Sequence, residues 1–199
     1  MPSVAKKKRP EQEFVEKKGV LNRLKEAAKE GRAHLFFFDE SGMSNVPNVQ
    51  RAWSPLGKPH CADASVAKKR VNILGALDYG ANTLTHTVHE TTVKRPDVVA
   101  FIDRLATQHT DGKPKIVVLD NASIHHHIDE EKIRTWLYDH RLILFYLPPY
   151  SPELNPIEIV WKQAKYHWRK FAARTKLDLV HEVNEIFQEY GHRFQIRYA

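Results

Sequence analysis

The spacing of apolar residues along the chain predicts alternating strands and helices. Continuous apolar runs, typical of buried strands, occur at His34–Phe38, Val71–Asp78, Lys115–Leu119 and Leu142–Leu147. Residues 82–89 instead alternate strictly, with Leu84, His86 and Val88 on one face, which predicts a half-buried strand. Only Tyr79, Gly80 and Ala81 separate it from the preceding run, so these two strands are expected to form a hairpin.

Helical periodicity fills most of the intervals between the strands. Helices are expected at residues 11–30, from Pro96 onward, and at 129–140, 155–173 and 178–190. In the third of these helices, Ile133, Trp136 and Leu137 are expected to face inward. Residues 41–70 are expected to be irregular, with a turn at Ser54–Pro59. A hairpin followed by strand–helix–strand units predicts an α/β fold with a mixed five-stranded sheet and helices on both faces.

Composition and charge limit the kinds of protein that the chain can be. Its 199 residues, 42% of them hydrophobic, suit one domain, and its single cysteine, Cys61, excludes an internal disulfide. No apolar stretch approaches the roughly 20 residues of a membrane span, and the first residues do not form a secretory signal. We therefore expect a cytoplasmic protein without a membrane partner.

The formal net charge of +7 is unevenly distributed along the chain. Residues 1–32 hold ten Lys or Arg and five Asp or Glu, a net charge of +5. We interpret residues 1–32 as a basic arm with one helix and residues 33–199 as the main domain. Such an arm is consistent with a nucleic-acid partner, although a solvated basic segment would have the same composition.

Three acidic residues have positions that suggest a common site. Asp39 ends one apolar run, Asp120 ends another, and Glu158 opens a helix after the proline-rich segment LPPYSPELNP. If the strands before the two aspartates are neighbours, their carboxylates emerge at one edge of the sheet. Hard oxygen ligands suit Mg²⁺ or Mn²⁺, and two such ions can clamp a phosphodiester for in-line displacement.

Each of these acids also has a simpler interpretation. Asp39 and Asp120 precede polar residues that favour turns. Glu158 stands three residues after Asn155, where it would complete a capping box with Asn155 as the N-cap. Glu153 is a competing carboxylate in the same loop, although it suits a turn.

Basic residues in two segments are candidate DNA phosphate contacts. Lys162, Lys165 and Arg169 follow Glu158 at helical spacing, beside an apolar stripe that includes Trp161. A second basic cluster consists of Lys68, Lys69 and Arg70. Such cations supply sequence-independent affinity for DNA, although a solvated basic face is the alternative.

Three consecutive histidines, His125, His126 and His127, invite a zinc interpretation. Consecutive side chains cannot all face one ion, and zinc pairs on helices prefer i, i+4 spacing. The alternative role for one of the three is an approach to a phosphate.

The strings FFFDESG, VVLDNASIHH and LPPYSPELNPIEIVWKQAK resemble the catalytic domain of the mariner superfamily of DDE transposases, in particular its bacterial insertion-sequence branch. The resemblance covers about residues 34–175 and implies a ribonuclease H-like fold. It also implies that Asp39, Asp120 and Glu158 are the catalytic acids and bind Mg²⁺ or Mn²⁺, two ions in all. The implied activity is metal-dependent cutting at transposon ends, followed by joining of the freed 3′-hydroxyl to target DNA, usually at a TA dinucleotide.

The same resemblance implies further partners. Transposases of this kind join two ends of double-stranded DNA, which implies a homodimer. The family usually carries N-terminal helix-turn-helix domains, so we expect a helix-turn-helix subunit to act in trans on a nucleoid-associated protein. Two other functions stay open from the sequence: a ribonuclease H-like nuclease that cuts without joining, and a catalytically silent DNA-binding or dimerisation module.

Overall fold

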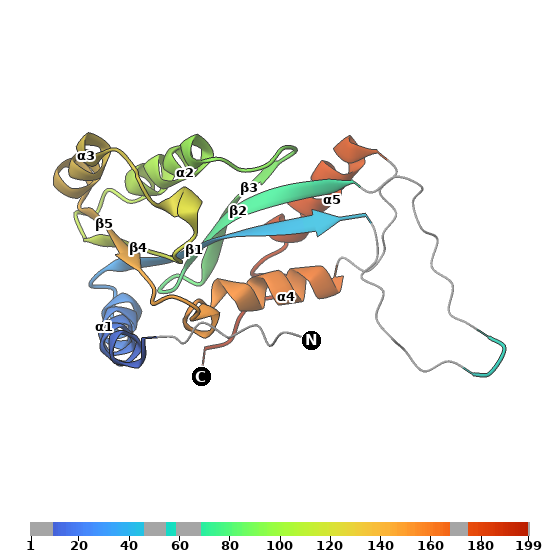
Figure 1. Ribbon diagram of the computed structural model, residues 1–199, viewed down its shortest axis with the longest axis horizontal. Helices are drawn as coiled ribbons and strands as arrows, with labels where there is room; N and C mark the ends of the chain where they lie inside the picture. Colours follow the sequence, from blue (N-terminus) through green and yellow to red (C-terminus); the bar gives the residue numbers. More distant parts are fainter. Residues whose placement is uncertain (1–9, 46–54, 59–68, 168–174, 199) are drawn as a thin grey trace, which may run out of the picture.

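A mixed five-stranded sheet forms the centre of the protein. The computed structural model describes residues 10–45, 55–58, 69–167 and 175–198, and Figure 1 shows the arrangement of their helices and strands. The strand order is β3-β2-β1-β4-β5, with β3 and β5 at the edges. The strands are β1 (His34–Ser44), β2 (Arg70–Asp78), β3 (Thr83–His89), β4 (Lys115–Leu119) and β5 (Leu142–Tyr146). The predicted five-stranded mixed sheet and the hairpin of β2 and β3 are confirmed.

Strand β1 is longer than the sequence suggested. It was expected to end at Phe38, ahead of an irregular segment, but it continues through Asp39 to Ser44. The expectation was wrong because the polar residues after Phe38 pair with β2, in a register that runs from Phe36↔Asp78 to Ser44↔Arg70. Such long-range pairing leaves no signal in the local sequence of β1.

Strand β1 pairs unequally with its two neighbours. Its parallel pairing with β4 runs only from His34↔Lys115 to Phe37↔Val118, whereas its antiparallel pairing with β2 continues to Ser44. Beyond Phe37, β1 therefore has one paired edge and one edge that β4 does not cover.

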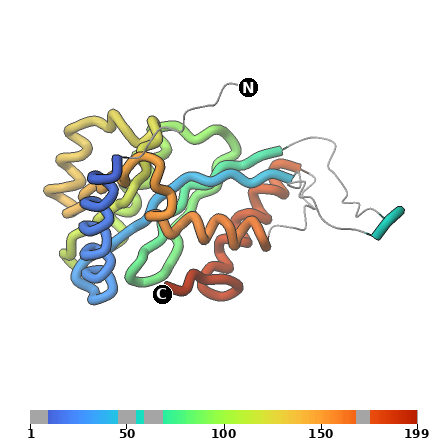
Figure 2. Tube along the Cα trace, turned by 60° about the horizontal axis from the view of Figure 1, so that its bottom comes forward, coloured from blue at the N-terminus to red at the C-terminus, as the bar shows by residue number. Residues whose placement is uncertain are grey.

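Helices cover both faces of the sheet, as predicted (Figure 1). Helices α2 (Arg95–Gln108) and α3 (Glu130–His140) lie on one face. The other face carries α1 (Glu11–Lys29), α4 (Ile157–His167) and α5 (Lys176–Gln188). Figure 2 shows α4 lying along the sheet, and its contacts are with β1 and β2. Among the described residues, no helix is both long enough and apolar enough to cross a bilayer.

Two apolar clusters, one on each face, hold these layers together. Alternate residues of β1 supply them: Leu35 and Phe37 face α1, α4 and α5, whereas Phe36 and Phe38 face α2 and α3. All four side chains are buried, which fixes the face of each later residue in β1.

Helix α3 is less deeply buried than the sequence predicted. Trp136 is fully buried, as expected, and its Nε1 donates a hydrogen bond of 2.7 Å to Asp103 Oδ1 of α2. Ile133 and Leu137, which were also expected to face inward, are 39% and 41% exposed. Helix α3 contacts the edge strand β5, so only a narrow stripe of the helix meets the core.

Helix α1 packs on the sheet as an amphipathic helix. Leu21 and Ala28 are buried in the same cluster as Phe37, with Phe14 and Leu24 partly buried against it. The predicted apolar stripe of this helix is confirmed. A domain boundary near residue 32 stays a prediction.

The contact between α4 and the sheet depends on a glycine. Gly75 of β2 pairs with Asp39, and a Cβ atom built on it would meet Cη2 of the buried Trp161 ring at 2.4 Å, closer than a methyl group tolerates. Gly75 therefore allows α4 to lie against the strand pair.

We predict that Gly75→Ala lowers the free energy of unfolding by about 1–3 kcal/mol, because the added methyl displaces a rigid buried ring. Gly19→Ala is the matched control, since nothing lies within 4 Å of its added Cβ and alanine favours the surrounding helix α1. Chemical denaturation of both variants measures the difference. Equal stability of Gly75→Ala and wild type would contradict the close packing of α4.

Candidate active site

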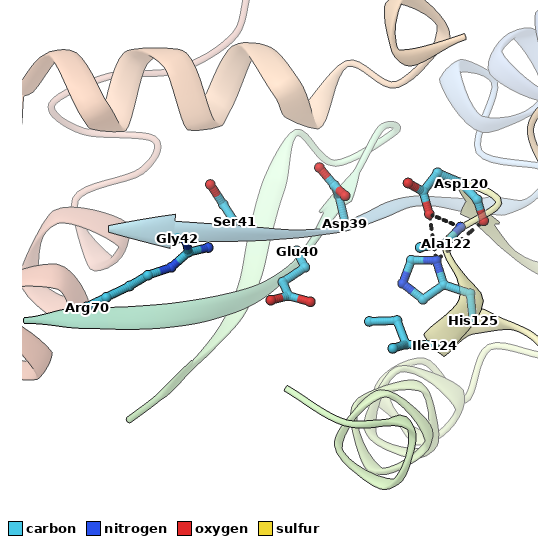
Figure 3. A pocket seen from close by; sticks show the side chains of 9 residues that line it. All are labelled: Asp39, Glu40, Ser41, Gly42, Arg70, Asp120, Ala122, Ile124 and His125. Carbon is cyan, nitrogen blue, oxygen red and sulfur yellow. Dashed lines mark hydrogen bonds and ion pairs between the residues drawn. The ribbon is translucent and has the colours of Figure 1, made fainter. Parts of the chain in front are cut away.

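Asp39 lies within β1 at the start of its unpaired edge. It belongs to the same alternating set as Leu35 and Phe37, so its side chain faces α4. Figure 3 shows Asp39 and Ser41 on one side of β1 and Glu40 on the other. Glu40 therefore points away from Asp39, on the opposite face of the strand.

Asp120 follows directly after β4, beside this unpaired edge of β1. One carboxylate oxygen, Oδ1, accepts a hydrogen bond of 2.9 Å from the Ala122 backbone N–H. The same oxygen lies 2.7 Å from His125 Nδ1 (Figure 3). His125 is buried in the short helix η1 (Ser123–His125) and packs edge-on against Phe38. The turn after β4 thus holds this carboxylate from two directions.

Glu158 stands in the first turn of α4 and is exposed. The start of this helix is tied to β1 by Asn155, whose buried side-chain amide donates a 3.2 Å hydrogen bond to the Phe38 carbonyl. The sequence suggested Asn155 as the helix N-cap; its amide instead makes this tertiary contact immediately before Asp39. The same loop holds η2 (Pro152–Leu154), which includes the exposed Glu153.

The three predicted acids are close enough to influence one another electrostatically. Burial raises the pKa of Asp39 to about 7; the hydrogen bond from Trp161 opposes this rise, and Glu158 and Asp120 add to it as like charges. Burial also acts to raise the pKa of Asp120, but the hydrogen bonds from His125 and Ala122 outweigh it, and this pKa is lowered. At neutral pH one aspartate is thus firmly ionised and the other sits near its midpoint.

Sequence reasoning missed two residues that hold the acids in place. Trp161 was assigned to the apolar stripe of α4, and it is buried there, but its Nε1 also donates a 3.0 Å hydrogen bond to Asp39 Oδ2. His125 was considered for zinc or phosphate binding, whereas it contacts Asp120. The only sequence signals were spacings: Trp161 one helical turn after Glu158, and His125 five residues after Asp120.

An open cleft of about 240 Å³ adjoins two of the acids. Its lining consists of Asp39, Glu40, Ser41, Gly42, Arg70, Asp120, Ala122, Ile124 and His125. Arg70 lies across Gly42, where a Cβ atom would overlap its guanidinium (Figure 3). Its Nε donates a 3.1 Å hydrogen bond to Asn72 Oδ1. The cleft therefore presents carboxylates beside an exposed cation.

The predicted basic residues occupy two places. Lys162 and Lys165 are exposed on α4 beyond Glu158. Arg70 lines the cleft at the start of β2, and Lys69 directly precedes it in the chain. Lys68 and Arg169 lie outside the described residues.

Of the remaining histidines in the run His125–His127, His126 stacks on Tyr146 with ring centroids 5.0 Å apart. Among the described residues, the three histidines do not gather as ligands of one metal ion.

The chain belongs to the DDE superfamily of endonucleases, because the model of that family matches residues 34–179. This span includes Asp39, Asp120 and Glu158. No curated protein matches the chain at a significant level.

Solved structures of a mariner transposase, Mos1, share the fold. The Mos1 paired-end complex with the left transposon end has 14% identity and a TM-score of 0.54, and the match covers 95% of this chain and 64% of that one. The Mos1 mariner paired-end complex with Mn has 16% identity and a TM-score of 0.56, with 95% and 63% covered. The chain thus has the ribonuclease H-like fold of a mariner-type catalytic domain and spans just under two thirds of the length of these proteins.

We predict that Asp39→Asn stabilises the protein at pH 8 in EDTA. The pKa of Asp39 is about 7 in the folded protein, above its ordinary 3.8, so ionisation opposes folding as pH rises through that interval. Asparagine removes the charge and keeps an acceptor for Trp161; a gain on the order of 1–4 kcal/mol is expected.

The gain should shrink at pH 5, where Asp39 is protonated in the folded protein. Thermal denaturation at both pH values tests this, with the exposed Asp139→Asn on α3 as the control. A variant less stable than wild type at pH 8 would show that burial and the neighbouring like charges do not destabilise the ionised Asp39 carboxylate.

Proposed function

We propose that this chain is the catalytic domain of a transposase that cuts and joins double-stranded DNA by metal-dependent phosphoryl transfer. The observation that carries the proposal is that Asp39 on β1 is influenced electrostatically by Asp120, at the end of β4, and by Glu158, at the start of α4. Burial raises the pKa of Asp39, and the like charges of Glu158 and Asp120 add to the rise; this arrangement has no evident benefit for folding, whereas a divalent cation would offset the charges.

The donor set fits Mg²⁺ or Mn²⁺. All three side chains offer carboxylate oxygens, which these hard cations prefer, and an open cleft adjoins the two aspartates. Mos1 complexes with Mg and with Mn support the same choice of metal. Bound in this site, two ions would supply a nucleophilic oxygen and stabilise the leaving oxygen of an in-line displacement.

Residues of this chain would orient the acids for that chemistry. Trp161 occupies one oxygen of Asp39, and His125 with the Ala122 N–H occupies one oxygen of Asp120. Oδ2 of Asp120 therefore stays available for metal, whereas Asp39 also accepts a backbone hydrogen bond from Glu40. Asn155 fixes the distance between the α4 start and β1, which limits the movement of Glu158 relative to Asp39.

Cations on both sides of the acids would hold the DNA backbone. Lys162 and Lys165 continue from Glu158 along the exposed side of α4. Arg70 lines the cleft, and Lys69 directly precedes it in the chain. Lys68 and Arg169 extend the same two sets in the sequence. Contacts of this type bind phosphates without reading bases.

The wider assembly follows from the same proposal. The partners would be transposon ends and a target site, with TA as the expected target, and a homodimer would hold two ends together. A helix-turn-helix subunit in trans would recognise the end sequence. Mos1 structures with a left transposon end and in a strand transfer complex support DNA as the substrate. Action on chromosomal DNA would place the protein in the cytoplasm with the nucleoid.

We predict that Asp120→Asn reduces Mn²⁺-dependent cleavage of a labelled duplex at least 100-fold, because it removes a charged metal ligand. Glu153→Gln, the competing carboxylate in η2, is the matched control and should retain wild-type activity. Mn²⁺ should also raise the melting temperature of wild type and of Glu153→Gln, but not of Asp120→Asn.

A second substrate in the same experiment separates joining from cutting. A pre-cut duplex with a free 3′-hydroxyl, incubated with a supercoiled target, should yield joined products that depend on Mn²⁺ and on Asp120. Cleavage without joining would identify a nuclease. Tight DNA binding without cleavage in either assay would identify a silent binding module.

We also predict that Lys162→Ala with Lys165→Ala weakens DNA binding equally for unrelated sequences and reduces the salt dependence of binding by about one unit of slope per lost contact. Arg134→Ala and Lys132→Ala, together on α3 and of equal charge change, are the matched control on the opposite face of the sheet. Fluorescence anisotropy across salt concentrations measures both. An unchanged slope in the α4 variant would remove this helix from the proposed DNA path.

A further inference from the structure

A second group of metal-ligand side chains lies at the other end of β1. His34 begins β1, Asp78 ends β2, and His109 directly follows α2. His34 is five residues before Asp39, roughly 16 Å along a strand. His34 also stacks on Phe36, on the face covered by α2, whereas Asp39 faces α4. The group is therefore separate from the acidic site in both position and face.

The three side chains already converge on one point. Asp78 Oδ2 lies 3.6 Å from His109 Nε2 and 3.9 Å from His34 Nδ1. One ligand atom from each residue lies within 4.8 Å of the others. Ligands at 2.0–2.2 Å from a tetrahedral ion are roughly 3.3–3.6 Å apart. A bound ion would therefore require the two histidine nitrogens to move a few tenths of an ångström closer to Asp78 Oδ2, and closer to each other from a separation within 4.8 Å. His109, at the end of its helix and 30% exposed in its side chain, has room to make that adjustment.

The buried carboxylate of Asp78 independently supports a cation at this group. The residue is only 3% exposed. Its Oδ1 accepts hydrogen bonds of 3.0 and 3.1 Å from the backbone N–H groups of Gly80 and Ala81. Its Oδ2 is buried, has no hydrogen-bond partner, and is the oxygen that faces the two histidines. A buried carboxylate oxygen without a partner is costly, and a cation at this point would satisfy it.

Asp111 orients His34 in the way that metal sites commonly require. Its carboxylate oxygens lie 3.0 and 3.1 Å from His34 Nε2. With the ring proton held on Nε2 by this contact, the lone pair of Nδ1 points to the side of Asp78. A carboxylate–histidine–metal arrangement of this kind fixes the tautomer and raises the basicity of the ligand nitrogen. The rings of His34 and His109 are stacked, with centroids 3.8 Å apart and an interplanar angle of 13°, so the His109 ring would have to rotate for its lone pair and that of His34 to reach one ion.

We propose that His34, Asp78 and His109 bind a borderline divalent cation of the Zn²⁺ type, with Asp111 as the supporting carboxylate. Two imidazole nitrogens and one carboxylate oxygen suit Zn²⁺ or Co²⁺, whereas Mg²⁺ prefers oxygen ligands alone. The partly exposed side of His109 leaves room for water as a fourth ligand. The ion would join β1, β2 and the segment after α2, and so stabilise the end of the sheet opposite the acidic cluster.

The competing explanation is an ion pair in which a protonated His34 bridges Asp78 and Asp111. A metal titration separates the two. The protein would carry no histidine tag, and it would contain Asp39→Asn, Asp120→Asn and Cys61→Ser to remove the acidic site and the thiol. Visible absorption would then follow Co²⁺ binding, and competition would follow Zn²⁺ and Mg²⁺.

We expect one Co²⁺ per chain, with the absorption of a tetrahedral nitrogen–oxygen site, displaced by Zn²⁺ but not by excess Mg²⁺. His109→Ala should abolish this signal, and Asp111→Asn should weaken the affinity about 10-fold or more. His126→Ala with His127→Ala is the control for binding to other histidines and should leave the signal unchanged. Circular dichroism in EDTA checks that each variant folds.

Zn²⁺ should also raise the melting temperature of the background protein, and His109→Ala should remove that rise. Failure of the background protein to bind Co²⁺ would overturn the proposal, and so would Co²⁺ binding that persists in His109→Ala. In either case the ion pair would be the better account. Neither result depends on DNA cleavage, so the proposed transposase activity is tested separately.

Discussion

The unequal pairing of β1 is the constraint on which the acidic site depends. Strand β4 accompanies β1 only as far as Phe37, while β2 continues beside it to Ser44. Asp39 therefore stands on a strand that is held rigidly on one side and open on the other. Asp120 enters that open side because it is the first residue after β4. A β4 that continued alongside β1 would have filled this space with backbone hydrogen bonds.

Helix α4 completes the site because its contacts with the sheet leave it little freedom. Gly75 gives space to the Trp161 ring, Trp161 bonds to Asp39, and Asn155 bonds to the Phe38 carbonyl. The helix that carries Glu158 is thus attached to β1 at Phe38 and at Asp39 itself. Its exposed cations then extend away from the acids, so one helix links the proposed chemistry to the proposed DNA path.

Much of this arrangement could be predicted from the sequence because it follows from local patterns. Apolar runs located the strands, and the order of strands and helices gave the sheet. The two aspartates were expected side by side, and β1 and β4 are indeed parallel neighbours. The extension of β1 to Ser44 and the exposure of Ile133 depend on which elements pair, which short sequence windows do not contain.

The contacts that hold the acids in place could not be predicted, because they too join residues that are far apart in the sequence. The bond from Trp161 to Asp39 spans 122 positions, and its residue type fits a core stripe equally well. His34, Asp78 and His109 lie far apart in the sequence, on three separate segments, so no short motif indicates that they form a group. Residues whose role is defined by a distant partner are visible only once the sheet has been assembled.

The independent anchoring of the two later acids has a consequence for how such chains vary in length. Asp120 is fixed by β4 and by the turn to His125, and Glu158 is fixed by the contacts of Asn155 and Trp161 with β1. Of the 37 residues between them, those between His125 and Asn155, including α3 at the sheet edge, are not needed to set the separation of the carboxylates. Insertions there can be accommodated, whereas one residue inserted between Asn155 and Trp161 would turn the helix by about 100°. The number of residues between the second and third acids is thus free to drift, and the short spacing around the third is not.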